Sequence, residues 1–408
     1  MIEKYLSKSI SDKSIKIIDT DIKYNHDFAT FSTTDIPDFL KSYLLNFLPM
    51  NIAVSQEHYK SIPTMTKYCL DFIGQLFHAD MKSNRYTGIA TVGSSEACIM
   101  AGVMMLTKWK INNRNSLQHP NIIISEAYQV CWKKFADMFS VRLNVVPTVG
   151  DSCVLDTDKL ASKIDSGTIG VVGILGNTFT GRYDDIPEIN KIVEEYNSKH
   201  KQNIIIHIDA ASGGFYDPFI NPDRIFFDFR LKNIYSINVS GHKYGLCPPS
   251  IGWLFCRSEL SSLNILENDL DYLGGQILSD KTINFSKSAI PLAAQYFLIS
   301  NLGFNGYGNI MQNLNRSFQS FVRDLKEISS IRIVSCGDIP MIVYTSNDVD
   351  LRKLEDLLLK KYGFYVPTYR LPGSNILCQR IVIRSDFTDT LQKEYLYALN
   401  DCINILKE

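Results

Sequence analysis

Between about residues 61 and 300, short apolar runs of strand character alternate with longer segments of helical periodicity. Neighbouring parallel strands need a crossover connection, usually a helix, and the crossovers cover both faces of the sheet. The alternation therefore predicts an α/β fold with a mainly parallel sheet. Ser95–Lys110 and Ile186–Lys199 are two of the connecting helices. The expected strands are Thr87–Val92, Asn121–Ser125, Arg142–Pro147, Gly170–Leu175, Asn203–Ile208, Ile234–Val239 and Gly252–Cys256.

The rest of the chain has a different pattern, and 408 residues are enough for more than one domain. We predict an N-terminal arm over residues 1–60, a large domain over 61–304 and a small C-terminal α+β domain over 305–408. The expected elements near and after this last boundary are the helices Ala289–Asn301, Tyr307–Ile328, Asp350–Tyr362 and Thr388–Leu406 and the strands Ile331–Val334, Met341–Thr345 and Gln379–Arg384.

Composition excludes several classes of function. The formal net charge is −1, so no electrostatic footprint for nucleic acid or an anionic membrane is visible. No run of about 18 apolar residues predicts a membrane span, and no apolar run near the start predicts a signal peptide. The nine cysteines form no CxxC pair, which favours a reduced cytoplasmic protein without a metal site.

Two polar clusters each follow an expected strand. Lys243 lies in Ser-Gly-His-Lys-Tyr-Gly, and Asp209 lies in His-Ile-Asp-Ala-Ala-Ser-Gly-Gly. A lysine amine can bond covalently to the aldehyde of pyridoxal phosphate (PLP), and a carboxylate can hold the pyridine nitrogen protonated. The cationic ring would in turn keep that carboxylate ionised. In isolation, a surface charge and a loop-capping acid are the commoner roles, but the two clusters together favour a PLP site.

Further residues fit the same cofactor. Gly93-Ser94-Ser95-Glu96-Ala97 joins a strand to a helix, where backbone N–H groups and hydroxyls can bind phosphate. An ordinary serine N-cap remains the alternative. If Lys243 binds the cofactor, His242 is a catalytic candidate that can donate to the phosphate or stabilise the aldimine, although a lone histidine is more often structural. Gln129 can cover the ring face opposite Ala211, or it can simply begin a helix.

Several segments resemble the PLP-dependent group II amino-acid decarboxylases: Thr91–Cys98, His207–Phe215 and Ser240–Gly245. Others resemble the glutamate decarboxylase branch of that family, namely Phe28–Phe31, Gln129 with Cys131–Phe135, Leu273–Gln276 and Ile283–Ser286. The similarity runs from about residue 27 to beyond 300 and returns at Arg380–Arg384. The resemblance implies the fold type I (aspartate aminotransferase-like) architecture, PLP as cofactor and a homodimer.

The resemblance also implies individual roles. Lys243 would form the Schiff base with PLP, and Asp209 would pair with the pyridine nitrogen. Ala211 and Gln129 would lie on the two faces of the ring. Thr178 would lie near O3′ and the substrate carboxylate. The phosphate would be held by Ser94, Ser95, Ser240 and His242, with Ser286 from the other subunit. The substrate would be bound by Thr30, Phe31 and Arg380, the last through a carboxylate.

The implied reaction is decarboxylation of an L-amino acid to an amine and CO2, with glutamate or a related acidic amino acid as the default substrate. Tyr272, close to Gly274-Gly275, is a candidate for a group that closes over the site and delivers a proton. Two alternatives stay open. A fold does not fix chemistry, so an aminotransferase, another lyase or an oxidative deaminase would fit it too. A non-catalytic PLP-fold binding protein is the second.

Two departures from the branch affect the expected pocket. Within Met50–Lys60, Ile52 stands where the glutamate decarboxylases have an asparagine, and Ser55 where they have an aspartate. The loss of hydrogen-bonding side chains from a pocket can change specificity by orders of magnitude. Aspartate, a sulfur-containing analogue or a less common amino acid are therefore alternative substrates.

Overall fold

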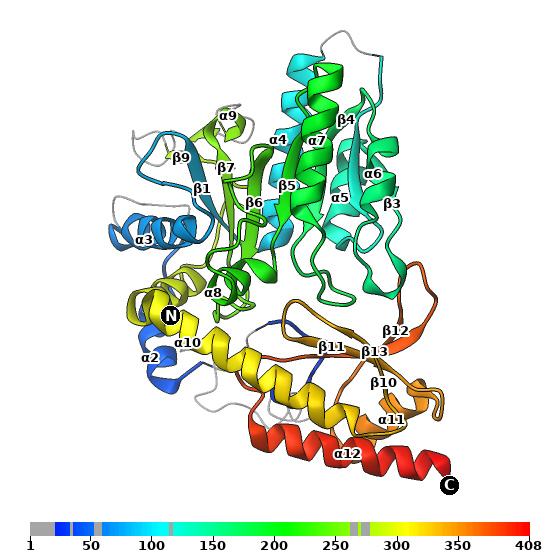
Figure 1. Cartoon of the computed structure of the whole chain (residues 1–408). Helices are drawn as coiled ribbons and strands as arrows, with labels where there is room; N and C mark the ends of the chain where they lie inside the picture. The colour runs from blue at the N-terminus through cyan, green and yellow to red at the C-terminus, as the bar shows by residue number, and fades with distance from the viewer. Residues whose placement is uncertain (1–20, 33–35, 53–58, 114–116, 262–267, 271–277) are drawn as a thin grey trace, which may run out of the picture.

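The computed structural model describes residues 21–32, 36–52, 59–113, 117–261, 268–270 and 278–408. Two sheets organise these residues. A seven-stranded sheet is built from residues that precede the long helix α10, and a four-stranded sheet from residues that follow it (Figure 1). Helix α10 spans Ile290–Lys326 and runs from one sheet to the other. Among the described helices, none has the length and apolarity that a bilayer span requires.

The seven-stranded sheet confirms the predicted α/β class. Its spatial order is β1-β7-β6-β5-β4-β2-β3, and only β7 runs antiparallel to its neighbours. The strands are β1 Tyr86–Thr91, β2 Asn121–Ser125, β3 Arg142–Val146, β4 Thr168–Ile174, β5 Ile205–Asp209, β6 Ile234–Ser240 and β7 Gly252–Arg257. Because β1, β4, β5 and β6 point the same way, their carboxyl ends share one edge of the sheet.

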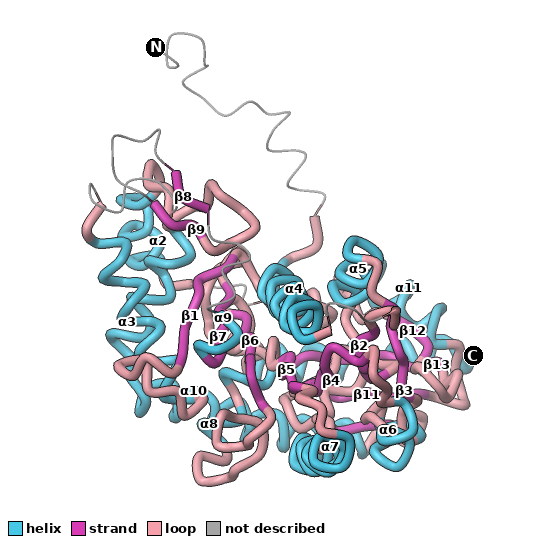
Figure 2. Tube along the Cα trace, turned by 90° about the horizontal axis from the view of Figure 1, so that it is seen from above, coloured by secondary structure: helices cyan, strands magenta, loops and turns pink. Residues whose placement is uncertain are grey.

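Helices cover both faces of this sheet. Viewed from above, α4 and α5 lie on one face, and α6 and α7 lie on the other (Figure 2). The elements of this region are α3 Ser61–Leu76, α4 Ser94–Asn112, α5 Val130–Phe139, α6 Thr157–Lys163, α7 Ile186–His200, α8 Asp217–Ile220 and α9 Ser258–Ser261, with 3-10 turns η4 Gly150–Ser152 and η5 Gly213–Phe215.

The local sequence explains these elements. Every residue of β2, β4 and β5 is buried. Because both faces of these strands are covered, their sequences are mostly apolar throughout and do not alternate between apolar and polar residues. The side chains of Asp156 and Asp185 accept backbone N–H groups in the first turns of α6 and α7. Pro187, at the start of α7, has its φ already set for a helix and needs no N–H partner there.

The C-terminal unit is an antiparallel sheet of order β10-β11-β13-β12 packed with helices. Its elements are β10 Arg332–Cys336, β11 Met341–Thr345, α11 Leu351–Tyr362, β12 Thr368–Arg370, β13 Leu377–Val382 and α12 Asp389–Lys407. Two short strands outside this unit, β8 Asn268–Leu270 and β9 Leu278–Asp280, pair antiparallel with each other. Gly303 kinks α10, with φ 56° and ψ −168°. The predicted boundary after residue 304 falls beside this kink.

The N-terminal residues pack against the C-terminal sheet. Their elements are η2 Tyr24–His26, α2 Asp38–Leu44 and η3 Leu45–Phe47. Between η2 and α2 the chain passes β13: the Val382 N–H donates to the carbonyl of Phe28 (3.1 Å), and the Phe28 N–H donates to the carbonyl of Tyr365 (3.0 Å). The segment that carries Thr30 and Phe31 is thereby fixed beside the small sheet.

Candidate functional site

The carboxyl edge of the large sheet brings the two predicted polar clusters together. Asp209 is the last residue of β5, and Lys243 lies three residues beyond the end of the neighbouring strand β6. Ser94 begins α4 directly after β1. Parallel strands end at one edge, which is the usual ligand-binding position in open α/β sheets. The topology of the sheet therefore brings the three motifs to one edge.

The amine of Lys243 lies in a desolvated position. Its Nζ donates to Ser212 Oγ at 3.0 Å and lies 5.1 Å from the ring centroid of Phe31. Burial lowers the pKa of Lys243, although the charge of Asp209 acts in the opposite direction. A lowered pKa increases the fraction of neutral amine, which is the nucleophilic form. Lys243 is therefore suited to covalent bonding with an aldehyde.

The carboxylate of Asp209 is buried and satisfied by three N–H donors. The indole Nε1 of Trp132 donates to Oδ2 at 3.1 Å, and the Asn238 amide donates to Oδ1 at 3.2 Å. The backbone N–H of Ala211 also donates to Oδ1 at 3.3 Å. A carboxylate that only accepts hydrogen bonds is in the state required to pair with a protonated ring nitrogen.

A phosphate-sized cradle lies at the start of α4. Ser94 Oγ is 2.7 Å from Ser240 Oγ, so two hydroxyls from distant segments converge. No side chain caps the helix, which leaves its first N–H groups pointing into the cradle. Gly252 on β7 is required here, because a Cβ would lie 2.5 Å from the Gly93 backbone. Beside it, His242 Nδ1 is 3.1 Å from the carbonyl of Ile251, and burial lowers the pKa of His242.

A half-buried arginine lies beside the same site. Arg380 on β13 donates through Nη1 to the carbonyl of Thr178 and through Nη2 to the carbonyl of Ala29 at 3.1 Å. Its guanidinium lies 5.4 Å from the centroid of the Phe31 ring. Arg380 Nε is buried without a hydrogen-bond partner among the described residues. An unpaired buried donor is costly, so a ligand acceptor at this position would be strongly favoured.

These features fit PLP as the cofactor. Lys243 can take the aldehyde, Asp209 the pyridine nitrogen, and the Ser94–Ser240 cradle the phosphate. The helix terminus and hydroxyls suit a dianion, while the acceptor-only carboxylate suits a cationic ring. A non-catalytic surface would not need a desolvated lysine and a buried carboxylate on one edge.

The contacts of the remaining predicted residues do not by themselves indicate a role in the site. Gln129 is exposed, and its Oε1 accepts the Val130 N–H at the start of α5. Ser95 and Ser286 are exposed. Ala211 lies two residues after Asp209, and the carbonyl of Thr30 accepts a hydrogen bond from Arg384 Nη1 at 3.3 Å. Tyr272 and Ser55 lie outside the described residues, so the role predicted for each remains a prediction.

Sequence reasoning missed several residues that complete the site. It did not assign Ser212 as the partner of Lys243, or Trp132 and Asn238 as donors to Asp209. Trp132 was within a motif that carried the resemblance, but its sequence position does not reveal a partner 77 residues away. Asn238 offered a signal, since an asparagine inside a buried strand needs a hydrogen-bond partner.

Glu96 is a further missed residue, and it is buried. Its Oε2 accepts the Val92 N–H at 2.8 Å, while Oε1 accepts the N–H groups of Ile283 (2.9 Å) and Asn284 (2.8 Å). One carboxylate thus joins the cradle loop to the segment that leads to Ser286. The neighbouring residues pair with the start of the chain, because the Ile52 N–H donates to the carbonyl of Lys287 at 2.9 Å.

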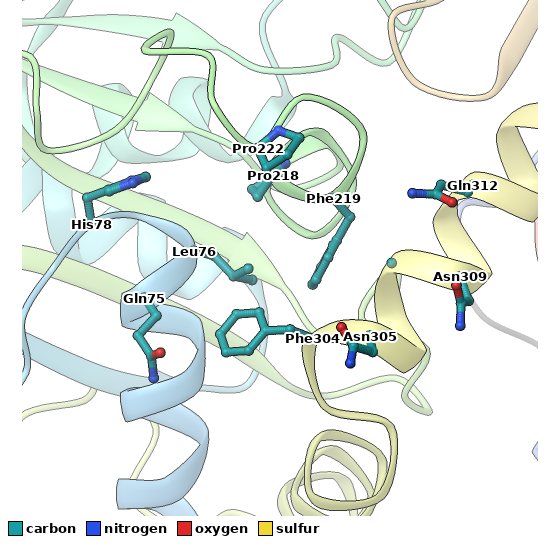
Figure 3. Close-up of a pocket in the computed structure, with 11 residues that line it drawn as sticks. Gln75, Leu76, His78, Pro218, Phe219, Pro222, Phe304, Asn305, Asn309 and Gln312 are labelled. Atoms are coloured by element: carbon teal, nitrogen blue, oxygen red, sulfur yellow. The ribbon is translucent and has the colours of Figure 1, made fainter.

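A separate pocket of about 630 Å³ lies between α3, α8 and α10 (Figure 3). Phe219 and Phe304 contribute apolar surface, and Gln75, Asn309 and Gln312 contribute amides. None of the predicted cofactor or substrate residues lines it. This pocket is therefore distinct from the site at the carboxyl edge of the sheet.

Comparisons with known proteins agree with this geometry. The family model described as "Pyridoxal-dependent decarboxylase conserved domain" matches residues 6–346. Glutamate decarboxylase beta of Listeria innocua is 39% identical over 380 residues, which are 90% of this chain and 81% of that protein. The solved structure of Lactobacillus brevis glutamate decarboxylase has a TM-score of 0.90 and 34% identity, covering 99% of this chain and 94% of that chain. L-methionine decarboxylase from Streptomyces sp. 590 shares the fold, with a TM-score of 0.80 and 15% identity over 97% of this chain and 96% of that one.

Proposed function

The chain belongs to the pyridoxal-dependent decarboxylase family and is a PLP-dependent carboxy-lyase; on that premise, we propose that it decarboxylates L-glutamate at Cα to the corresponding amine and CO2. The structural observation that supports a carboxylate-bearing substrate is Arg380, a half-buried cation whose buried Nε has no partner among the described residues. The choice of glutamate is supported by the relatives named glutamate decarboxylase.

The residues of this chain divide the work. PLP, when bound, supplies an electron sink for the pair released from the Cα–carboxylate bond. Asp209 keeps the ring nitrogen protonated, and the Ser94–Ser240 cradle fixes the phosphate end. Lys243 supplies the amine, whose pKa burial lowers and whose hydrogen bond Ser212 Oγ accepts. Phe31 excludes water beside Lys243, which strengthens the electrostatic interactions of the site.

Arg380 is proposed to bind a substrate carboxylate, with Thr178 and Phe31 shaping the surrounding pocket. Two of its donors already hold the backbone at Thr178 and Ala29, so its orientation is fixed before substrate arrives. Its guanidinium also lies 5.6 Å from the ring centroid of Tyr369. Pre-organised cations bind carboxylates without the cost of ordering a flexible side chain.

The test of the substrate is a panel of L-amino acids presented to the PLP-loaded enzyme. We expect CO2 from carboxyl-labelled glutamate, the matching amine by mass spectrometry, and no 2-oxo acid. A main product from aspartate or a sulfur-containing acid would overturn the substrate assignment, in line with Ile52 replacing a hydrogen-bonding residue. A 2-oxo acid as the main product would show transamination instead.

Replacement of Arg380 by glutamine should lower kcat/KM for glutamate by about 10- to 100-fold, since a charge-assisted hydrogen bond is lost. Binding of PLP, measured by titration of its absorbance, should change little. Arg370→Gln on the neighbouring strand β12 is the matched control, because Arg370 is exposed. Unchanged kcat/KM in Arg380→Gln would remove Arg380 from the substrate pocket.

We also propose that the enzyme is a cytoplasmic homodimer in which Ser286 reaches the phosphate of the partner subunit. All nine cysteines are free, as expected in a reducing compartment. Ser286 is exposed and follows the segment held by Glu96, which supports a role outside its own subunit. Val130 and Met138 also leave apolar surface exposed on α5, where a second copy would bury it.

A further inference from the structure

Four polar side chains form a block inside the large sheet, behind the cofactor site. His207 and Asp209 lie on β5, while Ser236 and Asn238 lie at the paired positions of β6. Alternate residues of a strand share one face, so all four side chains lie on the same face of the sheet. Their exposure is 0–5%. Four polar groups in a buried parallel sheet are costly unless each is hydrogen-bonded.

Every member of this block has a partner within the block. Ser236 Oγ is 2.8 Å from His207 Nδ1, and His207 Nε2 is 2.8 Å from Asn238 Oδ1. The amide nitrogen of Asn238 then donates to Asp209 Oδ1 at 3.2 Å. The four residues therefore form one continuous chain of hydrogen bonds that ends at the carboxylate facing the pyridine nitrogen.

The direction of each hydrogen bond follows from Asp209. An ionised carboxylate only accepts, so Asn238 must present its NH2 group to Asp209 and its Oδ1 to His207. His207 must then donate from Nε2. In a neutral imidazole, the form that burial favours, Nδ1 is left to accept the proton of the Ser236 hydroxyl.

We propose that His207 is a positioning residue for the cofactor, acting through Asn238 to hold the Asp209 carboxylate in the orientation and acceptor state that keep the PLP ring nitrogen protonated. The inference rests on the PLP site and is independent of which amino acid is decarboxylated. The hydrogen bonds from His207 to Asn238 and from Asn238 to Asp209 support this role. His207 itself does not need to contact the ring nitrogen, because Asp209 would make that contact.

The surroundings keep His207 neutral. Burial lowers its pKa to about 4, and the nearby charge of Asp209 only partly opposes this. The Trp132 indole packs against the imidazole, with ring centroids 5.2 Å apart, while it donates to the other oxygen of Asp209. Burial also raises the pKa of Cys98, so its thiol stays protonated and donates to Asn238 Oδ1 at 3.5 Å. Asn238 Oδ1 thus receives two donors, which fixes the orientation of the amide.

Two variants separate positioning from packing. His207→Leu fills the space but removes the stronger donor to Asn238 Oδ1, so only the Cys98 thiol still holds the amide and the partner of Asp209 is less firmly fixed. His207→Gln retains an amide N–H for Asn238 and is the matched control. We expect His207→Leu to bind PLP on the order of tenfold more weakly. Nitrogen NMR of PLP labelled at the ring nitrogen, without substrate, should show a loss of the protonated form. His207→Gln should restore both towards wild type.

Wild-type affinity and an unchanged ring-nitrogen signal in His207→Leu would overturn the proposal. If that variant does not fold, the unmodified holoenzyme still provides a test. NMR of isotope-labelled histidine should show His207 as the neutral form protonated on Nε2, without titration between about pH 5 and 8. A ring protonated on Nδ1 alone would contradict the order of the hydrogen bonds, and titration in this range would contradict the neutral imidazole. Neither measurement uses turnover, so failure here is distinguishable from a wrong substrate.

Discussion

Replacement of Lys243 by alanine should reduce turnover by several orders of magnitude, on the order of 10³-fold or more, as for the loss of a covalent catalyst. The side chain is the desolvated amine at the carboxyl edge of the sheet, and burial has already lowered its pKa. Lys243 alone can supply the amine that the proposed site requires. The measurement is single-turnover CO2 release under saturating PLP.

Borohydride gives this prediction a second readout. Reduction of the wild-type holoenzyme should fix the cofactor on the peptide that contains Lys243 and abolish its visible absorbance band, and Lys243→Ala should show no such adduct. Lys232→Ala is the control, since Lys232 is exposed and pairs with Glu194 away from the cleft. Near-wild-type turnover in Lys243→Ala, or an adduct on another lysine, would be incompatible with the assigned site.

Asp209→Asn should produce the second large effect, a loss of turnover on the order of 10³-fold. The amide keeps the size of the side chain but removes the charge that pairs with the ring nitrogen. It also presents an NH2 group where Trp132 and Asn238 already donate, so two donors would oppose each other. Nitrogen NMR of the bound cofactor should show a deprotonated ring.

A buried aspartate outside the site provides the control for Asp209→Asn. Asp228 is 2% exposed and bonds to Arg230, and its replacement by asparagine should lower stability without changing the state of the ring. A matching loss of ring protonation in Asp228→Asn would mean that the effect reflects general damage to the core. Retained turnover in Asp209→Asn would contradict the role of Asp209.

The sequence predicted the large sheet closely, because its strands are buried on both faces and have short helical crossovers. Asn121–Ser125 and Met341–Thr345 coincide with the observed strands, and other ends differ by one or two residues. The sequence did not predict β12, since three residues with an exposed arginine give little periodic signal. Helices were expected on either side of Gly303, and the non-helical φ and ψ of this residue divide α10 into two segments there.

Local sequence motifs predicted a site residue only where the functional group and its neighbours lie in one short segment. Lys243, Asp209 and Ser94 each follow a strand, so the topology of a parallel sheet brings them together. Glu96 and the backbone it holds at Asn284 are 188 residues apart, and no periodic pattern connects them. Arg380 was identified through a resemblance, while its free Nε became visible only from the packing of β13.

The hydrogen bond between Arg380 and Ala29 has a consequence for biosynthesis. These two residues are 351 positions apart, nearly the full length of the chain. During translation, the lysine and aspartate of the cofactor site leave the ribosome well before the strand that closes the substrate side. Contacts between distant segments are the slow ones to form. In a nascent chain, the residues that would hold the vitamin therefore emerge before Arg380, the residue that we assign to the substrate, has been synthesised.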